Sequence, residues 1–212
     1  MRLSRIKFTD QTAVYHCMSR IVAGHALLEN GDREQLRKII WQQADFCGIQ
    51  ILTYCVLSNH FHVLIRVPGP CVMGDQELLR RVKRLYGEGH KQSVLLETSI
   101  QETGRLSEEQ RKELEARMGD VSAFMKELKQ RFSRWFNGRY ERFGTLWAER
   151  FKSVVIEDQP SHVGTLAAYV DLNPVRAGLV EDPKEYRFSG YGEAVAGNKL
   201  AQEGIESFHA QA

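Results

Sequence analysis

Hydrophobic positions in the first third of the chain follow two periods, one typical of strands and one typical of helices. Three segments are rich in strand-forming residues: residues 12–21, 49–57 and 60–67. Ser58 and Asn59 separate the last two segments, a spacing that indicates a hairpin. Between the first two, residues 32–46 place apolar side chains at helical spacing, and Gly48 ends this predicted helix. The pattern therefore predicts the order strand, helix, strand, strand.

The rest of the chain predicts further helices and a fourth strand. Helical spacing occurs in residues 75–86, 107–118 and 121–136, and again from Pro160 to the residues before Pro174. A capping box begins the second of these helices at Ser107, and residues 151–157 predict the fourth strand. We therefore predict an α+β fold, an antiparallel sheet with helices packed on one face. Small and polar residues predict a loose tail over residues 198–212.

Composition agrees with one packed domain and shows that charge is unevenly distributed. The chain has 212 residues, 42% of them hydrophobic, and a net charge of only +2. Residues 126–152 nevertheless carry eight basic and three acidic side chains together with seven aromatic ones, whereas residues 95–120 carry seven acidic and four basic side chains. The small net charge thus conceals a basic, aromatic segment beside an acidic one.

Cysteine spacing and hydropathy indicate where the protein works. The four cysteines form no C-x-x-C pair, and no apolar signal core follows Met1. No apolar run approaches the roughly 20 residues needed to cross a bilayer. We therefore expect reduced thiols, no membrane partner and a cytoplasmic location.

Two histidines in the third predicted strand are candidate metal ligands. His60 and His62 stand at i and i+2, so their side chains leave the same face of the strand and can grip one ion. The alternative is that both are packing or surface residues. Nucleotide hydrolases with a His-x-His-x-His motif are excluded, because the next alternate position is Leu64.

A tyrosine and an asparagine near the end of the last predicted helix form the second candidate pair. Tyr169 and Asn173 are four residues apart, so they share one face of a helix. By itself, Tyr169 is better explained as a buried tyrosine, because a helix that packs on a sheet commonly buries one. A tyrosine hydroxyl beside a metal that holds a phosphate can cut and rejoin a nucleic-acid strand.

Together these motifs resemble a known family. The resemblance rests on four segments: Tyr15-His16, the run 55–65 with its His-x-His, Gly144-x-x-Trp147-x-x-Arg150-Phe151, and Tyr169-x-x-x-Asn173-Pro174-Val175-Arg176-Ala177-Gly178-Leu179-Val180. This set is similar to the IS200-like single-tyrosine transposases of the HUH type, and within them to the branch associated with repetitive extragenic palindromes (REP). The last segment is the most specific.

The resemblance implies a ferredoxin-like or RRM-like domain over residues 1–197, with a helical insertion at about 71–138. It implies single-stranded DNA with hairpins as the partner, a homodimer, association with the nucleoid when bound to DNA, and Mg²⁺ or Mn²⁺ as cofactor. His60 and His62 fall on the family's metal histidines, Tyr169 on its nucleophile, and Asn173 on a third polar ligand.

The basic, aromatic segment is the candidate DNA-binding surface. We predict that Arg139, Arg142, Arg150 and Lys152 neutralise phosphates and that aromatic side chains, Trp147 among them, stack on unpaired bases. The alternative is an amphipathic helix and loop whose aromatic residues belong to the core and whose arginines are solvated.

The sequence thus favours a metal-dependent DNA strand transferase that forms a covalent 5′-phosphotyrosine at Tyr169. Two other functions stay open. One is a module of the same fold that binds DNA hairpins or RNA without cutting them, and the other is a metal-dependent phosphoesterase that uses water. Formation of a protein-DNA adduct separates the three.

Overall fold

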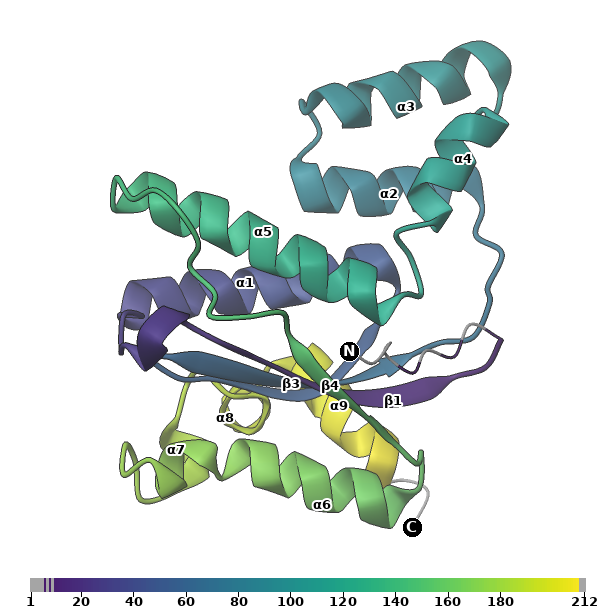
Figure 1. Ribbon diagram of the computed structural model, residues 1–212. Coiled ribbons are helices and arrows are strands. Elements are labelled where there is room, and N and C mark those ends of the chain that lie inside the picture. The colour runs from purple at the N-terminus through teal and green to yellow at the C-terminus, as the bar shows by residue number, and fades with distance from the viewer. Residues whose placement is uncertain (1–5, 7, 9, 210–212) are drawn as a thin grey trace.

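A computed structural model describes residues 6, 8 and 10–209 and shows a four-stranded antiparallel sheet (Figure 1). The strands stand in the order β2-β3-β1-β4. Their bounds are Ala13–Arg20 for β1, Gln50–Val56 for β2, His60–Val67 for β3 and Lys152–Ile156 for β4. All four predicted strands and the hairpin between β2 and β3 are confirmed.

The order of elements along the chain is that of a ferredoxin-like domain. Helix α1, Asn30–Cys47, connects β1 to β2, and α5, Val121–Arg139, is the last helix before β4. Both pack on the face of the sheet where Tyr15, Cys17 and Val63 are buried. The predicted α+β class with an antiparallel sheet is therefore confirmed.

Local signals explain where α1 begins and ends. Glu29 and Asp32 form a capping box, each side chain accepting a hydrogen bond from the backbone of the other end of the first turn. At the other end Gly48 adopts φ of 68°, the left-handed conformation that glycine takes without strain. The predicted end of this helix at Gly48 is confirmed.

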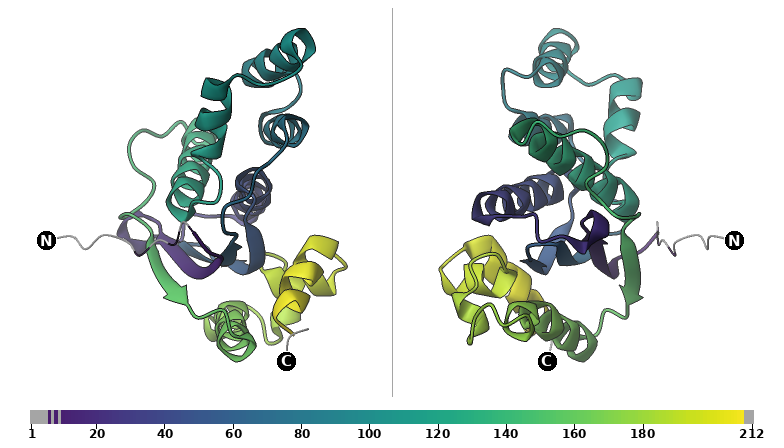
Figure 2. Two further views of the ribbon diagram at one scale, coloured as in Figure 1. Left: turned by 90° about the vertical axis from the view of Figure 1, so that its right-hand side faces the viewer. Right: turned by 60° about the vertical axis from the view of Figure 1, so that its left-hand side comes forward.

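Three helices between β3 and α5 extend away from the sheet. They are α2, Asp75–Tyr86, α3, Lys91–Thr103, and α4, Glu108–Glu115. The capping box predicted at Ser107 begins α4. Helix α3 is absent from the sequence prediction, because it buries only Ser93 and Leu96 while Val94 and Leu95 are exposed. Figures 1 and 2 show α3 and α4 standing apart from the sheet, whereas α5 lies along α1.

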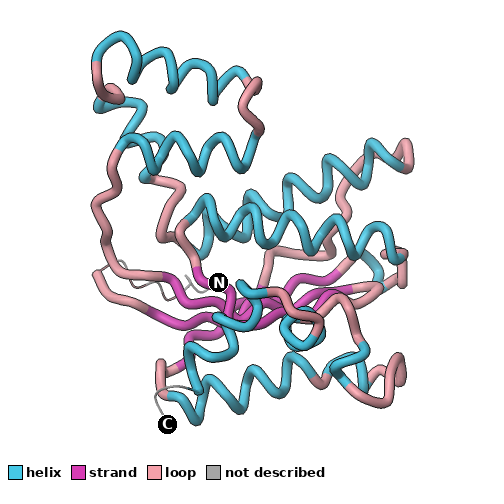
Figure 3. The backbone as a smooth tube through the Cα atoms, turned by 180° about the vertical axis from the view of Figure 1, so that it is seen from behind, coloured by secondary structure: helices cyan, strands magenta, loops and turns pink. Residues whose placement is uncertain are grey.

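Helices cover the second face of the sheet as well, which corrects the prediction of helices on one face only. The covering elements are α6, Pro160–Asp171, α7, Asn173–Arg176, α8, Gly190–Val195, and α9, Lys199–His209. Val14, Leu52 and Leu64 from the sheet pack there against Val163 of α6 and Phe208 of α9. The sheet is consequently the middle of three layers (Figure 3).

The C-terminal segment is a packed helix, so the prediction of a loose tail over residues 198–212 is wrong for residues 199–209. Ala201 and Phe208 are each only 3% exposed. A Cβ atom on Gly204 would lie 2.3 Å from the carbonyl oxygen of Ile51 in β2. The small residues of α9 suggest a loose segment in the sequence. In the structure they allow the helix to approach the sheet this closely.

Membrane crossing is not supported by any helix of the described chain. None combines the length and the apolar character that a bilayer span requires.

We predict that Gly204→Ala weakens the docking of α9. The added methyl group meets backbone rather than a flexible side chain, so we expect a loss of about 1–3 kcal/mol in the free energy of unfolding. Gly138→Ala is the matched control, because a Cβ at this position of α5 meets nothing within 4 Å and should stabilise the helix by up to about 1 kcal/mol. Urea titration of the three proteins measures both effects, and equal stability of Gly204→Ala and wild type would contradict the close packing.

Candidate active site

The two predicted metal histidines lie at the start of β3 and face α6. Side chains alternate along the strand, so Phe61 and Val63 enter the core beneath α1 and α5 while His60 and His62 point to the other face. Their ring centroids are 5.1 Å apart and the rings are nearly perpendicular. The structure therefore brings the pair together on one face, as the sequence predicts.

Hydrogen bonds determine which nitrogen of His60 carries the proton. Its Nδ1 lies 2.6 Å from Oδ1 of Asn59, and Nδ2 of Asn59 donates to the carbonyl oxygen of Gly24 at 3.0 Å. An amide oxygen only accepts, so Nδ1 of His60 must be the donor. In the neutral ring this leaves the lone pair on Nε2 available to bind a metal.

A third histidine, to which the sequence analysis assigns no role in the site, joins it from β1. Nε2 of His16 lies 2.9 Å from Nδ1 of His62, and the two ring planes are inclined by only 15°, with centroids 5.1 Å apart. In the register His62 stands opposite Met18, so His16 is its diagonal neighbour on the same face. The sequence alone does not place His16 in the site, because its contact with His62 follows from the pairing of β1 with β3.

Tyr169 reaches the histidines from α6. Its side chain is 40% exposed, and its ring centroid lies 6.1 Å from that of His62 and 6.2 Å from that of His16, edge to face in both cases. The guanidinium of Arg176 lies 5.1 Å from the centroid of the tyrosine ring. An accessible phenol thus stands beside the histidine cluster with a positive charge over its ring.

Asn173 lies just beyond the end of α6, at the first residue of α7. Its Nδ2 donates to the carbonyl oxygens of Tyr169, at 2.8 Å, and Val170, at 3.2 Å. These bonds fix the orientation of the amide. Among the described residues Oδ1 has no hydrogen-bond donor assigned to it, so this oxygen can take a further partner.

Electrostatics keep the histidines neutral. Burial lowers the pKa of His62 to about 3, and the nearby imidazoles and Arg20 add to that shift. Burial, and then the charge of Arg20, lowers the pKa of His60. Burial also lowers the pKa of His16. Arg20 stands directly across from His60 in the register of β1 and β3, and the sequence prediction did not include it.

The chemistry of these donors fits a divalent ion at His60 and His62. Both are neutral imidazoles on one face, and the Nε2 lone pair of His60 has no competing proton. In the part of the chain that the structure describes, no three His, Cys, Asp or Glu side chains form a group able to hold a metal. An amide oxygen is another donor type that such an ion accepts.

Asp171 holds the end of α6 in place between Tyr169 and Asn173. Thr53 Oγ1 of β2 donates to its carboxylate at 2.7 Å, and the backbone N–H of Tyr191 in α8 donates at 3.3 Å. Burial raises the pKa of Asp171 to about 7, although both hydrogen bonds oppose the shift. This anchor connects the position of the tyrosine to the sheet.

The predicted DNA-binding residues lie at the end of α5 and in the segment that leads to β4. Arg139 stands over the rings of Trp135 and Tyr140, and Arg142 over that of Phe136. Arg150 is exposed, and Nζ of Lys152 lies 3.1 Å from a carboxylate oxygen of Glu149. The four basic side chains are thus at the surface or partly exposed.

The prediction that Trp147 stacks on bases is corrected by its position in the core. It is 8% exposed, and its ring packs against Phe61 and Phe132. Its indole N–H donates to the carbonyl oxygen of Lys129 at 3.1 Å. Trp147 therefore connects the segment before β4 to α5, and only a small part of its surface lines the open space along α5.

An open groove of about 830 Å³ runs between α5 and this segment. Four basic side chains line it: Lys126, Lys129, Arg134 and Arg150. A second open groove of about 550 Å³ separates β4 from α6 and ends at Tyr169. The first has the charge expected of a surface that binds phosphates, and the second gives access to the tyrosine.

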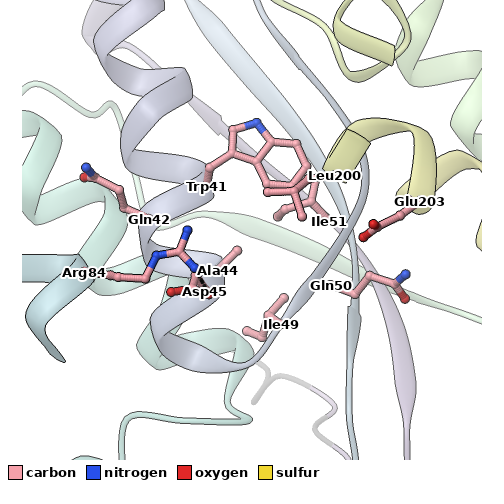
Figure 4. Close-up of a pocket in the computed structure, with 11 residues that line it drawn as sticks. Trp41, Gln42, Ala44, Asp45, Ile49, Gln50, Ile51, Arg84, Leu200 and Glu203 are labelled. Atoms are coloured by element: carbon pink, nitrogen blue, oxygen red, sulfur yellow. Dashed lines mark hydrogen bonds and ion pairs between the residues drawn. The ribbon is translucent and has the colours of Figure 1, made fainter. Parts of the chain in front are cut away.

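A smaller pocket of about 300 Å³ lies between α1, β2 and α9 (Figure 4). Trp41 and Leu200 line it, and Arg84 at its rim pairs with Asp45 at 3.2 Å. None of the predicted site residues contributes to this pocket.

Comparison with known proteins supports the family resemblance. Residues 9–87 match the family described as IS200-like transposases, a range that contains β1, β3 and both candidate metal histidines. The resemblance to IS200-like transposases is confirmed. Tyr169 lies outside the range that matches the transposase family. A comparison with curated proteins found no match.

A solved structure described as a REP-associated tyrosine transposase bound to a REP hairpin has the same fold. It superimposes with a TM-score of 0.59, covering 95% of this chain and 90% of that protein, at 16% sequence identity. The likeness extends beyond the residues that match the IS200-like transposase family and includes the helices on the second face of the sheet.

We predict that Asp171→Asn stabilises the protein at high pH. A carboxyl whose pKa is raised on folding stabilises fully below its unfolded value of 3.8, and this contribution is lost as the pH rises through about 7. Asparagine keeps an acceptor for Thr53 but carries no charge. Relative to wild type, its advantage should grow by roughly 4 kcal/mol between pH 4 and pH 8. Urea titrations at several pH values measure this, and a difference independent of pH would contradict the buried carboxyl.

Proposed function

We propose that this protein cuts and rejoins single-stranded DNA at hairpins, with Tyr169 as the nucleophile. The observation that carries the proposal is the convergence of Tyr169 from α6 with His62 from β3, their ring centroids 6.1 Å apart. A binding module gains nothing from a solvent-accessible phenol at a cluster of neutral imidazoles. The match to IS200-like transposases supports the same class of reaction.

In the proposed step Tyr169 Oη attacks the phosphorus of a phosphodiester. A bond forms between the tyrosine oxygen and phosphorus, the bond from phosphorus to O3′ breaks, and the phenol loses its proton while the 3′ oxygen gains one. The products are a 5′-phosphotyrosine and a free 3′-hydroxyl. Because the new ester retains the bond energy of the old one, a 3′-hydroxyl can reverse the step without a nucleotide cofactor.

His60, His62 and Asn173 are the proposed ligands of Mg²⁺ or Mn²⁺. The histidines contribute neutral nitrogens and Asn173 an amide oxygen, a set that hard or borderline divalent ions accept. When bound, such an ion polarises a phosphoryl oxygen and fixes the phosphate in place. The side chains of the protein orient the phenol relative to that phosphate.

Two arginines supply positive charge near the proposed reacting groups. Arg176 lies over the ring of Tyr169, and Arg20 stands across from His60. A phosphate that takes on negative charge during attack is stabilised by fixed cations at this range. Neither arginine belongs to the set predicted from sequence.

The proposed partner is single-stranded DNA that contains hairpins. The REP-associated transposase with the same fold is bound to a hairpin of this kind. In this chain Arg139, Arg142, Arg150 and Lys152, together with the basic groove along α5, are the proposed contacts for phosphates. The protein acts in the cytoplasm in this proposal and associates with the nucleoid when it binds DNA. We also propose that it functions as a homodimer.

We predict that Tyr169→Phe abolishes covalent attachment to DNA. Wild-type protein, incubated with a labelled single-stranded hairpin and Mn²⁺, should give a band of protein-linked DNA on a denaturing gel. Tyr191→Phe is the matched control, because that tyrosine is similarly exposed, 37% against 40%, and should still form the adduct.

The same gel distinguishes the other two functions. Cleavage without an adduct in wild type would replace tyrosine transfer by hydrolysis with water. Retention of several hairpins with no cleavage at all would favour the binding module. An adduct that persists in Tyr169→Phe would assign the nucleophile to another residue.

We predict that removing basic side chains beside the groove lowers the salt dependence of binding. Arg150→Ala with Lys152→Ala should weaken hairpin binding and reduce the slope of log K against log[salt] by about 1 for each phosphate that the variant no longer neutralises. Arg105→Ala, at an exposed arginine between α3 and α4, is the control and should leave the slope unchanged. Fluorescence anisotropy at several salt concentrations measures the slopes, and equal slopes would exclude these residues from the interface.

A further inference from the structure

We propose that His16 is a positioning residue that holds His62 in the tautomer needed to bind the metal. In this arrangement Nδ1–H of His62 donates to Nε2 of His16, and the lone pair on Nε2 of His62 faces the metal. The inference rests on the proposed metal-dependent function and identifies a residue that acts through another.

The argument begins with the hydrogen bond between the two rings. Nε2 of His16 and Nδ1 of His62 lie 2.9 Å apart, which requires that one of them donates and the other accepts. A histidine that binds a metal must be neutral, and with both rings neutral only two assignments of the proton exist. The choice between them decides which nitrogen of His62 is free.

Only one assignment allows His62 to bind a metal. Its Nδ1 is already engaged by His16, so a metal must take Nε2. If His16 were the donor, Nε2 of His62 would carry the proton and could not bind. If His16 is the acceptor, Nε2 of His62 is free and His16 is protonated on Nδ1.

A hydrogen-bond acceptor also determines the tautomer of His60, for which the position of the proton is already assigned. Asn59 accepts from Nδ1 of His60 through its amide oxygen, which leaves Nε2 of His60 free. With His16 as acceptor, His60 and His62 both have Nε2 free for the metal. In each ring Nδ1–H donates to a neutral acceptor. The two acceptors come from different elements, the β2–β3 hairpin and β1.

The position of His16 is rigid enough for this role. It lies in β1, which pairs on both sides, with β3 and with β4. Its neighbours Tyr15 and Cys17 are buried on the opposite face, and the planes of the His16 and His62 rings differ by only 15°. A neutral acceptor also brings no negative charge to a site that must receive a phosphate, unlike the carboxylate that often supports a metal-bound histidine.

Two substitutions of His16 distinguish the effect of its hydrogen-bond acceptor from the effect of its side-chain volume. In His16→Gln the terminal amide oxygen takes the place of Nε2 and can accept from His62. In His16→Leu there is no acceptor. His25→Leu, at an exposed histidine, is the control. Circular dichroism and urea titration establish that each variant is folded.

The first measurement is the protonation of the histidine nitrogens by ¹⁵N NMR of the metal-free protein. We expect wild type to show Nδ1–H on His62 and on His16, and His16→Gln to retain Nδ1–H on His62. In His16→Leu we expect His62 to move toward the Nε2–H form. Nε2–H on His62 in wild type would overturn the inference.

The second measurement is the affinity for Mn²⁺ by calorimetry. We expect His16→Leu to bind roughly 10–100-fold more weakly than wild type, the range typical for loss of a group that supports a metal ligand. His16→Gln and the His25 control should stay within a few fold of wild type. Equal affinity of wild type and His16→Leu would overturn the inference.

These results are independent of those that test the reaction. Wild type that binds no Mn²⁺ would remove the metal from the proposed function, while the NMR tautomers would still decide what His16 does. Conversely, loss of the adduct in Tyr169→Phe tests the nucleophile and is unaffected by the His16 result.

Discussion

Side chains along β1 and β3 point alternately to two faces of the sheet, and the antiparallel pairing of these strands aligns the two alternations. Tyr15 and Cys17 of β1 meet Val63 and Ile65 of β3 on the side of α1 and α5, where the core is mainly apolar. His16 of β1 and His62 of β3, which alternate with these residues along the strands, point to the other face of the sheet. The burial of one face therefore determines the register, and the register brings the polar groups of the other face together.

A second layer of helices completes the site without enclosing it. Val163 and Ala167 of α6 pack on the sheet, while Tyr169 from the last turn remains 40% exposed. Asp171 fastens this turn to Thr53 in the sheet. A rigid connection to the apolar part of the sheet thus controls the distance between the phenol and the imidazoles, and one side stays open for a long substrate.

The parts of this arrangement that depend on local pattern could be predicted from the sequence. Strand periodicity, the capping box at Ser107, and the spacing of His60 with His62 and of Tyr169 with Asn173 are all short-range signals. What could not be predicted depends on contacts between distant segments. The contact of His16 with His62 depends on the register of β1 and β3. The burial of Trp147 depends on the packing of α5 on the sheet. The sequence of α9 resembles a loose tail, and only the close approach of Gly204 to β2 shows that it is packed.

The order in which the two faces of the sheet are covered has a consequence for how the protein is made. Helices α1 and α5 precede β4, so the apolar face can be closed while the rest of the chain is still being synthesised. Helices α6 to α9 follow all four strands in the chain, and α9 adds Phe208 to the packing around Val14 and Leu64. The histidine face is therefore completed after the apolar face, so a nascent chain that has not yet reached α6 still lacks Tyr169 and Asn173.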